Sequence, residues 1–186
     1  SDVFEWEGNF VHKAVVSALK PGTEYFYTVG GANGVSEKGS FITDDGNDKF
    51  EFIAVADIQA SSDENFAKGA ETVRAGLKTM PGAEFIVNLG DFTNDSNNEE
   101  WDAYARNVKD IHAKTTLVPI AGNHDGLSGG AWGGAVADEL TVDGIVLRHR
   151  SEPGEARPEI SGHFHPKLRV APRGRPVARP CFAGDD

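Results

Sequence analysis

The sequence predicts an α/β protein in which a partial β module precedes a larger domain built on a parallel sheet. Short apolar runs at 50–56, 84–89 and 117–121 have the length and composition of buried strands. Segments of helical periodicity separate these runs, as expected when helical crossovers join parallel strands. Residues 1–43 instead alternate apolar and polar residues between glycine-rich turns, a pattern typical of hairpins.

Length and composition limit the protein classes. The chain has 186 residues, enough for one domain or one domain with a small module, and its 39% hydrophobic content is that of a globular protein. No stretch approaches the roughly 18 apolar residues of a membrane span, and no signal peptide is visible. The single cysteine, Cys181, excludes an internal disulfide framework and a cysteine-rich zinc site.

The β module and the domain after it are separated by a short linker. Only about three strands are expected within residues 1–43, too few to close a sandwich. The module must therefore dock on the next domain, pair with another chain or be incomplete. Residues 44–49 are polar and rich in turn formers, and they lead to a domain over 50–186.

Two amphipathic helices are expected in this domain. The first covers 62–80, with Ser62 as its N-cap, and the second covers 98–113. The second helix has an apolar stripe of Trp101, Tyr104, Val108 and Ile111. This stripe favours core packing over ligand binding. His112 near its end and His12 in the β module are also assigned to structure.

Side chains that bind metals follow the predicted strands. They are Asp57 and Gln59 after the first strand, Asp91 after the second, and Asn123, His124 and Asp125 after the third. The carboxyl ends of parallel strands share one edge of a sheet, so these groups are expected to lie together. Taken singly, Asp57 could cap a helix, Gly90-Asp91 could be a plain turn, and Asn123-His124-Asp125 could be a polar turn.

Histidines downstream strengthen the metal hypothesis. Gly162-His163-Phe164-His165 places two imidazoles around a turn, which favours ligation. His149 lies between two arginines, so a surface role is also open for it.

These clusters, in this order, resemble the motifs of the calcineurin-like metallophosphoesterases: D-x-H, G-D, G-N-H-D/E, a lone H and G-H-x-H. The likeness spans roughly residues 50–165 and departs at Gln59, where the common pattern has His. It implies a four-layer α/β/β/α sandwich that hydrolyses phosphate monoesters or diesters at a dinuclear centre. It also implies two divalent or trivalent ions, of Mn, Fe, Zn or Co.

The resemblance divides the ligands between two metals. The first would be held by Asp57, Gln59 and His165. The second would be held by Asn123, His149 and His163. Asp91 would bridge the two, His124 would protonate the leaving group or stabilise the transition state, and Asp125 would orient the His124 ring and raise its pKa. Because an amide oxygen is a poorer ligand than imidazole, Gln59 leaves a non-catalytic or weakly metal-binding scaffold as the alternative function.

The two halves of the chain resemble different branches. Residues 1–125 look like fibronectin-III-bearing, purple-acid-phosphatase-like enzymes, because 19–27 carries the pattern L-x-P-G-T-x-Y of a tyrosine corner. Residues 140–186 resemble the bacterial ligase-associated metallophosphoesterases. A seam near 126–138, within a glycine-rich loop, would mark a chimera or a natural recombinant, with C-terminal strands missing. The front half suggests a secreted or cell-surface protein and the back half a cytoplasmic one.

Charge is unevenly distributed. Residues 1–147 contain 10 Lys and Arg against 24 Asp and Glu, whereas residues 148–186 contain 8 against 5. The C-terminal arginines are Arg169, Arg173, Arg175 and Arg179. The simpler interpretation is that these arginines lie on a solvated hairpin. The more specific interpretation is that they contact the phosphate backbone of a nucleic acid. The sequence leaves the substrate and the oligomeric state open.

Overall fold

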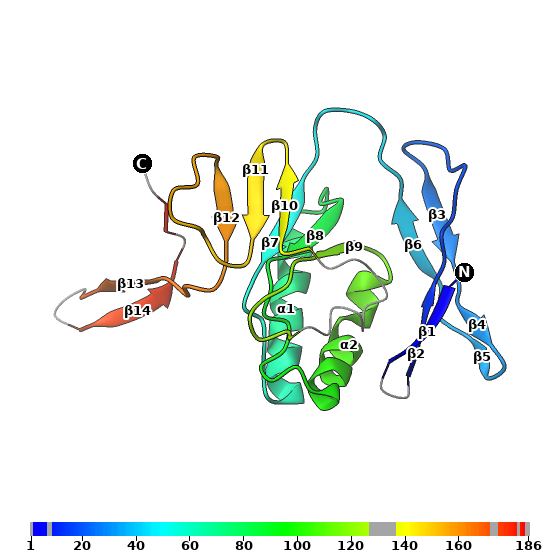
Figure 1. Ribbon diagram of the computed structural model, residues 1–186, viewed down its shortest axis with the longest axis horizontal. Coiled ribbons are helices and arrows are strands. Elements are labelled where there is room, and N and C mark those ends of the chain that lie inside the picture. The colour runs from blue at the N-terminus through cyan, green and yellow to red at the C-terminus, as the bar shows by residue number, and fades with distance from the viewer. Residues whose placement is uncertain (1, 7–8, 127–136, 172–174, 182, 185–186) are drawn as a thin grey trace.

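The computed structural model has three parts: N-terminal short strands, a central α/β body and a C-terminal hairpin (Figure 1). It describes residues 2–6, 9–126, 137–171, 175–181 and 183–184. The seam predicted near 126–138 therefore lies almost entirely outside the described residues. Within them, no helix is both long and apolar enough to cross a membrane.

The N-terminal part consists of six short strands, more than the three expected from the sequence. They pair as β1 (Asp2–Trp6) with β2 (Asn9–Lys13), β3 (Glu24–Tyr27) with β6 (Gly39–Ile42), and β4 (Gly30–Gly31) with β5 (Gly34–Val35). All three pairs are antiparallel. The Tyr25 hydroxyl accepts a hydrogen bond from the Lys20 backbone N–H at 2.9 Å, the contact expected of a tyrosine corner.

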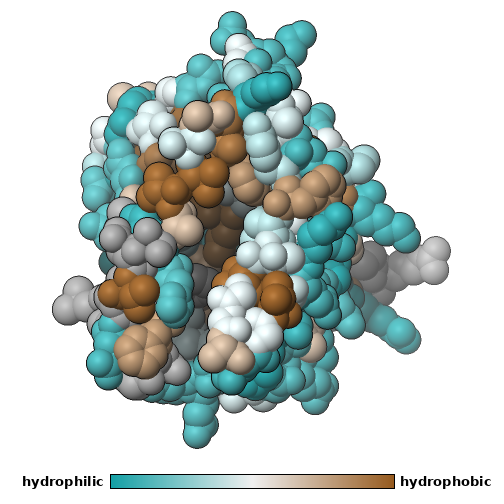
Figure 2. Space-filling model, turned by 90° about the vertical axis from the view of Figure 1, so that its right-hand side faces the viewer, coloured by the Kyte–Doolittle hydropathy of each residue, from teal (hydrophilic) through white to brown (hydrophobic). Residues whose placement is uncertain are grey.

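These strands bury little of their apolar surface. Phe26, Val35 and Ile42 are all exposed, and Figure 2, which faces this side of the molecule, shows apolar surface around a central hollow. The contact with the body is polar: the Ser40 N–H donates to the carbonyl oxygen of Ala113 at 2.8 Å. The module therefore docks on the body just after its second helix.

The body is organised around a parallel sheet. It consists of β7 (Phe52–Val55), β8 (Phe85–Asn88) and β9 (Thr116–Pro119), with β8 in the centre. Ile53, Ile86 and Leu117 belong to the core on one face of this sheet, whereas Val87 and Val118 belong to the core on the other. This alternation confirms the three predicted strands as elements buried on both faces.

Helices α1 (Asp63–Thr79) and α2 (Asn98–His112) cover the first face and confirm both predicted helices. Ser62 caps α1 as expected, since its side chain accepts from the Asn65 N–H. The predicted apolar stripe of α2 lies in this core, where Tyr104 packs edge-to-face on Phe92 and Phe66. His112 is structural too, because its Nε2 lies 3.2 Å from the Tyr104 hydroxyl.

A second sheet packs on the other face. It consists of β10 (Glu139–Val142), β11 (Ile145–Arg148) and β12 (Glu159–Ser161). β10 runs antiparallel and β12 parallel to the central β11. Val87, Leu89, Ile120 and Leu147 form the buried centre between the two sheets. The layers are therefore helices, first sheet and second sheet.

The predicted fourth layer, helices on the outer face of the second sheet, is not found in the described part of the chain. Because Leu147 points into the core, its neighbour Arg148 points to that outer face. The Arg148 guanidinium is buried there among four carboxylates. Its ion pairs are with Glu139 (3.2 Å), Glu152 (3.1 Å), Glu155 (2.6 Å) and Glu159 (3.2 Å).

The four glutamates around Arg148 raise its pKa and help to attach the loop between β11 and β12 to the second sheet. Burial lowers the pKa of Arg148, but the surrounding glutamates outweigh that effect and raise it. Glu152, Glu155 and Arg157 all lie in the loop between β11 and β12, so their ion pairs tie that loop to the sheet. Charge pairing thus occupies a face where the sequence predicted helices.

The chain ends in an antiparallel hairpin of β13 (Lys167–Val170) and β14 (Val177–Pro180). It projects from the body on the side opposite to β1–β6 (Figure 1). Cys181 closes its base, because its N–H donates to the Pro166 carbonyl oxygen at 3.0 Å, and its thiol is free.

We expect Glu155→Gln to lower the melting temperature at neutral pH and to weaken its dependence on acid. Hydrogen bonds from Arg157 and then Arg148 hold the pKa of Glu155 well below its ordinary value of 4.5. Because the folded state has the lower pKa, this stabilisation is complete above pH 4.5 and is lost as the pH falls below it. Melting curves from about pH 7 to about pH 3 measure the difference.

Glu152→Gln is the matched control, since Glu152 pairs with the same arginine but its side chain is 77% exposed. Its effect should be small at every pH. Parallel pH curves for the wild type and Glu155→Gln would contradict the prediction.

Candidate metal centre

The candidate residues lie where strands of both sheets end. Asp57 and Gln59 follow β7, Asp91 follows β8, Asn123 to Asp125 follow β9, His149 follows β11, and His163 and His165 follow β12. Four of them adopt left-handed backbone conformations: φ is 55° at Asp57, 57° at Asp91, 69° at His163 and 43° at His165. Such strained conformations concentrate at functional sites.

Glycines let these strand ends approach one another. A Cβ on Gly122 would overlap the backbone nitrogen of Asp91, and a Cβ on Gly90 would lie 2.7 Å from the His149 Nδ1. A Cβ on Gly162 would lie 2.5 Å from that of Ala56. Any side chain at these three positions would push the strand ends apart.

Three side chains form a compact cluster that could hold a metal ion. One ligand atom from each of Asp91, His149 and His163 lies within 4.8 Å of the other two. The His149 Nε2 is 3.4 Å from Asp91 Oδ2, 3.2 Å from His163 Nδ1 and 3.0 Å from Asn123 Oδ1. Four of the seven predicted ligands therefore meet here.

Hydrogen bonding shows why this cluster suits a cation. The His149 Nδ1 lies 2.8 Å from the Leu89 carbonyl oxygen, which can only accept, so Nδ1 carries the proton. In the neutral ring Nε2 then offers a lone pair, and it faces the oxygens of Asp91 and Asn123. Groups about 2.1 Å from one metal ion lie roughly 3.0–3.4 Å apart, so the spacing fits such an ion.

A second cluster adjoins the first. The His165 Nε2 lies 3.2 Å from Asp57 Oδ1, and the Asp57 carboxylate accepts from the His163 backbone N–H at 2.9 and 3.1 Å. Gln59 Nε2 donates to Asp91 Oδ2 at 3.3 Å. The Gln59 Oε1 is buried without a hydrogen-bond partner among the described residues, as expected of an atom that binds a cation.

The His124 ring contacts a backbone carbonyl group. Its Nδ1 lies 2.7 Å from the Asn94 carbonyl oxygen. Asp125 is buried, and it accepts from the backbone N–H groups of Asp91, Phe92, Thr93 and Gly122 at 2.7–3.1 Å. These hydrogen bonds go to the backbone, and the predicted role of Asp125 as the partner of the His124 ring stays a prediction. Asp125 holds the loop after β8 against the turn after β9.

Glu100 is a supporting residue that the sequence analysis did not identify. Its Oε2 accepts from the backbone N–H groups of Asn94 and Asp95 at 2.9 and 2.7 Å. The Asp95 N–H and the Asn94 carbonyl oxygen belong to the same peptide group, so Glu100 also fixes the carbonyl that orients the His124 ring. The feature of the sequence that could have identified Glu100 is the spacing Asn97-x-x-Glu100 at a helix start. This spacing normally indicates only a capping box.

Comparison with known families decides the classification. Residues 50–167 match the family described as calcineurin-like phosphoesterase. The chain belongs to this family. A calcineurin-like phosphoesterase is a metal-dependent hydrolase that acts on phosphate esters, and this agrees with the ligand set described above.

One solved structure supports the same fold. It is the crystal structure of Pseudomonas putida nuclease MPE, which has a TM-score of 0.56 and 19% sequence identity to this chain. The alignment covers 85% of this chain and 81% of that one. At this identity the likeness shows the fold alone. No curated protein sequence matches this calcineurin-like phosphoesterase.

For this calcineurin-like phosphoesterase we expect Gln59→His to raise metal affinity. The Gln59 Oε1 would be a neutral amide ligand, and imidazole binds Mn, Fe, Zn and Co ions better. Titration of the metal-free protein with Mn²⁺ or Zn²⁺ in a calorimeter measures the change. Gln59→Leu, which has no ligand atom, should weaken binding at the same position. Equal or weaker binding by Gln59→His would contradict the assignment.

Proposed function

We propose that the protein hydrolyses phosphate esters at a dinuclear metal centre formed by both clusters. The observation that carries this proposal is that the Asp91 and Asn123 side-chain oxygens both lie close to the His149 Nε2. The pair Asp57–His165 lies beside this group. Asp91 lies between the clusters, because its Oδ2 is close to both Gln59 and His149. A shared carboxylate at this place is what a dinuclear site requires.

Each predicted residue then has a role. One ion would be held by Asp57, Gln59 and His165. The other would be held by Asn123, His149 and His163. Asp91 would bridge them, and when bound the two ions would supply Lewis acidity toward the phosphate oxygens and activate water. The acidic character of most of the chain offsets their positive charge.

His124 would act on the leaving group. Its backbone N–H donates to Asp91 Oδ1 at 3.0 Å, which keeps the residue beside the proposed bridge. Because Nδ1 is engaged by the Asn94 carbonyl oxygen, Nε2 is the atom that can hold a proton for the departing alkoxide. The side chain is exposed, so a substrate can reach it.

The nature of the phosphate ester and the origin of the N-terminal module are also part of this proposal. A structural neighbour is a nuclease, which makes nucleic acid a candidate ester for this chain. The tyrosine-corner contact of Tyr25 favours a fibronectin-III-like origin for residues 1–43, although the family match begins at residue 50. A non-catalytic scaffold is the alternative, and metal content separates the two functions.

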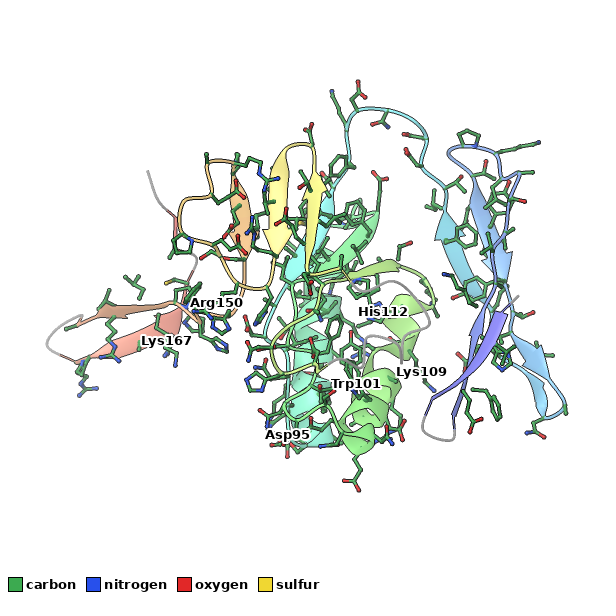
Figure 3. All side chains as sticks on the ribbon, viewed as in Figure 1. Asp95, Trp101, Lys109, His112, Arg150 and Lys167 are labelled. Atoms are coloured by element: carbon green, nitrogen blue, oxygen red, sulfur yellow. The ribbon has the colours of Figure 1, made fainter. Side chains whose placement is uncertain are left out.

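Asp91→Asn should abolish hydrolysis and lower metal content. Asp91 is 2% exposed, and the substitution removes the charge of the proposed bridge. The measurements are elemental analysis and turnover of bis(4-nitrophenyl) phosphate, with the wild type stripped of metal and reloaded as reference. Asp95→Asn is the control, because Asp95 lies in the same loop with an exposed side chain (Figure 3). Wild-type turnover by Asp91→Asn would exclude Asp91 from the site.

His124→Ala should slow hydrolysis about 10²–10⁴-fold for an alkyl ester while metal content stays unchanged. The loss should be smaller for a nitrophenyl ester, whose leaving group needs little protonation. Steady-state kinetics on both esters, with a metal assay on the same preparation, test this. Loss of metal would make His124 a ligand, and equal slowing of both esters would show that it does not protonate the leaving group.

A further inference from the structure

Positive charge is concentrated next to the metal centre. Residues 160–184 contain five Lys and Arg residues and no Asp or Glu, whereas the rest of the chain contains 13 basic and 29 acidic residues. The described members on the hairpin are Lys167, Arg169, Arg175 and Arg179. All four are exposed, and none forms an ion pair with another described residue. The hairpin is therefore a cationic arm on an otherwise acidic protein.

The arm begins at the candidate centre. Pro166, whose carbonyl oxygen closes the base of the hairpin, directly follows the predicted ligand His165. Lys167 at this base and Arg150, which follows His149 in the chain, both lie on the side from which the hairpin projects (Figure 3). A long anion bound at the centre would therefore reach these cations.

Both faces of the arm carry charge. In the β13–β14 register Arg169 pairs with Ala178, and Leu168 pairs with Arg179. Opposed residues share a face, so Arg169 and Arg179 lie on opposite faces. Leu168 and Val170 share one face and are 57% and 46% exposed, and Arg169 and Ala178 on the other face are exposed too, so neither face packs against the body. This surface fits an extended partner better than a small ester.

An exposed aromatic ring completes the surface. Phe164 lies between the two candidate ligands His163 and His165 and is 57% exposed. Its ring packs edge-to-face on His163, with centroids 5.1 Å apart. Proteins that bind single strands combine cations that contact phosphates with aromatic rings on which bases stack. Phe164 and the arm supply both features.

We infer that Phe164 and the β13–β14 arm bind a single-stranded nucleic acid and guide its backbone to the metal centre. This inference rests on the proposed function and names its substrate class. The acidic remainder of the chain would repel a polyanion, so local positive charge is needed to admit one. The arm provides that charge on one side of the centre.

The test is binding of a fluorescein-labelled oligothymidylate, followed by anisotropy in EDTA at several salt concentrations. Arg169→Gln, Arg175→Gln and Arg179→Gln together should lower affinity roughly 10²-fold at 0.1 M salt and reduce the logarithmic salt slope by about 2. The control combines Lys78→Gln, Lys109→Gln and Lys114→Gln, an equal charge change at exposed sites on the helical side. The control should lose less than about threefold. Equal losses in the two triple variants would overturn the inference.

Phe164→Ala should weaken binding roughly 5- to 150-fold, and Phe164→Trp should retain it. Unlabelled single strand should compete better than a duplex of equal length or polyglutamate of equal charge. A duplex that competes equally would overturn the preference for single strands, and equally effective polyglutamate would overturn nucleic acid as the partner. Hydrolysis of bis(4-nitrophenyl) phosphate should be unchanged in the arginine variant. If the wild type fails to hydrolyse that ester, the proposed function fails while the binding result still decides this inference.

Discussion

The candidate centre depends on one buried carboxylate, that of Asp125. It accepts four backbone hydrogen bonds, three from the loop after β8 and one from the turn after β9. Burial raises the pKa of Asp125, against the opposing effect of these hydrogen bonds. Without this acceptor the four N–H groups, three of them in buried residues, would lose this hydrogen bond, which is costly. Asp91 and His124 are therefore held in place by a residue that need not touch a substrate.

A second set of charges supports the other half of the site. Arg148 and its glutamates fasten the loop between β11 and β12, which begins at His149, and His163 follows β12. The ring of His149 is oriented by the Leu89 carbonyl oxygen of the first sheet. The two sheets are thus joined by an apolar core between their faces and by polar contacts at their ends, where the candidate ligands meet.

Local patterns allowed much of the fold to be predicted. Apolar runs predicted the three parallel strands, and Ser62 and the apolar stripe around Tyr104 predicted the two helices. These predictions were possible because they depend only on residues close in sequence. The fourth layer was not predictable in this way. Whether Arg148 faces a helix or a loop depends on glutamates up to eleven residues away that the fold brings together. The six short N-terminal strands also exceeded the prediction, because two of them have only two residues.

The sequence by itself determined the kind of chemistry: carboxylates, imidazoles and amides after successive strands, in an order that resembles one family. Only the tertiary structure decided which atoms meet. It placed His149 Nε2 against Asp91 and Asn123, left Gln59 Oε1 without a hydrogen-bond partner among the described residues, and placed His124 Nδ1 against the Asn94 carbonyl oxygen. The physical reason is that residue order fixes the strand on which a group lies. Its distance to another group depends on backbone conformation and close packing between segments up to about a hundred residues apart, such as Asp57 and His163.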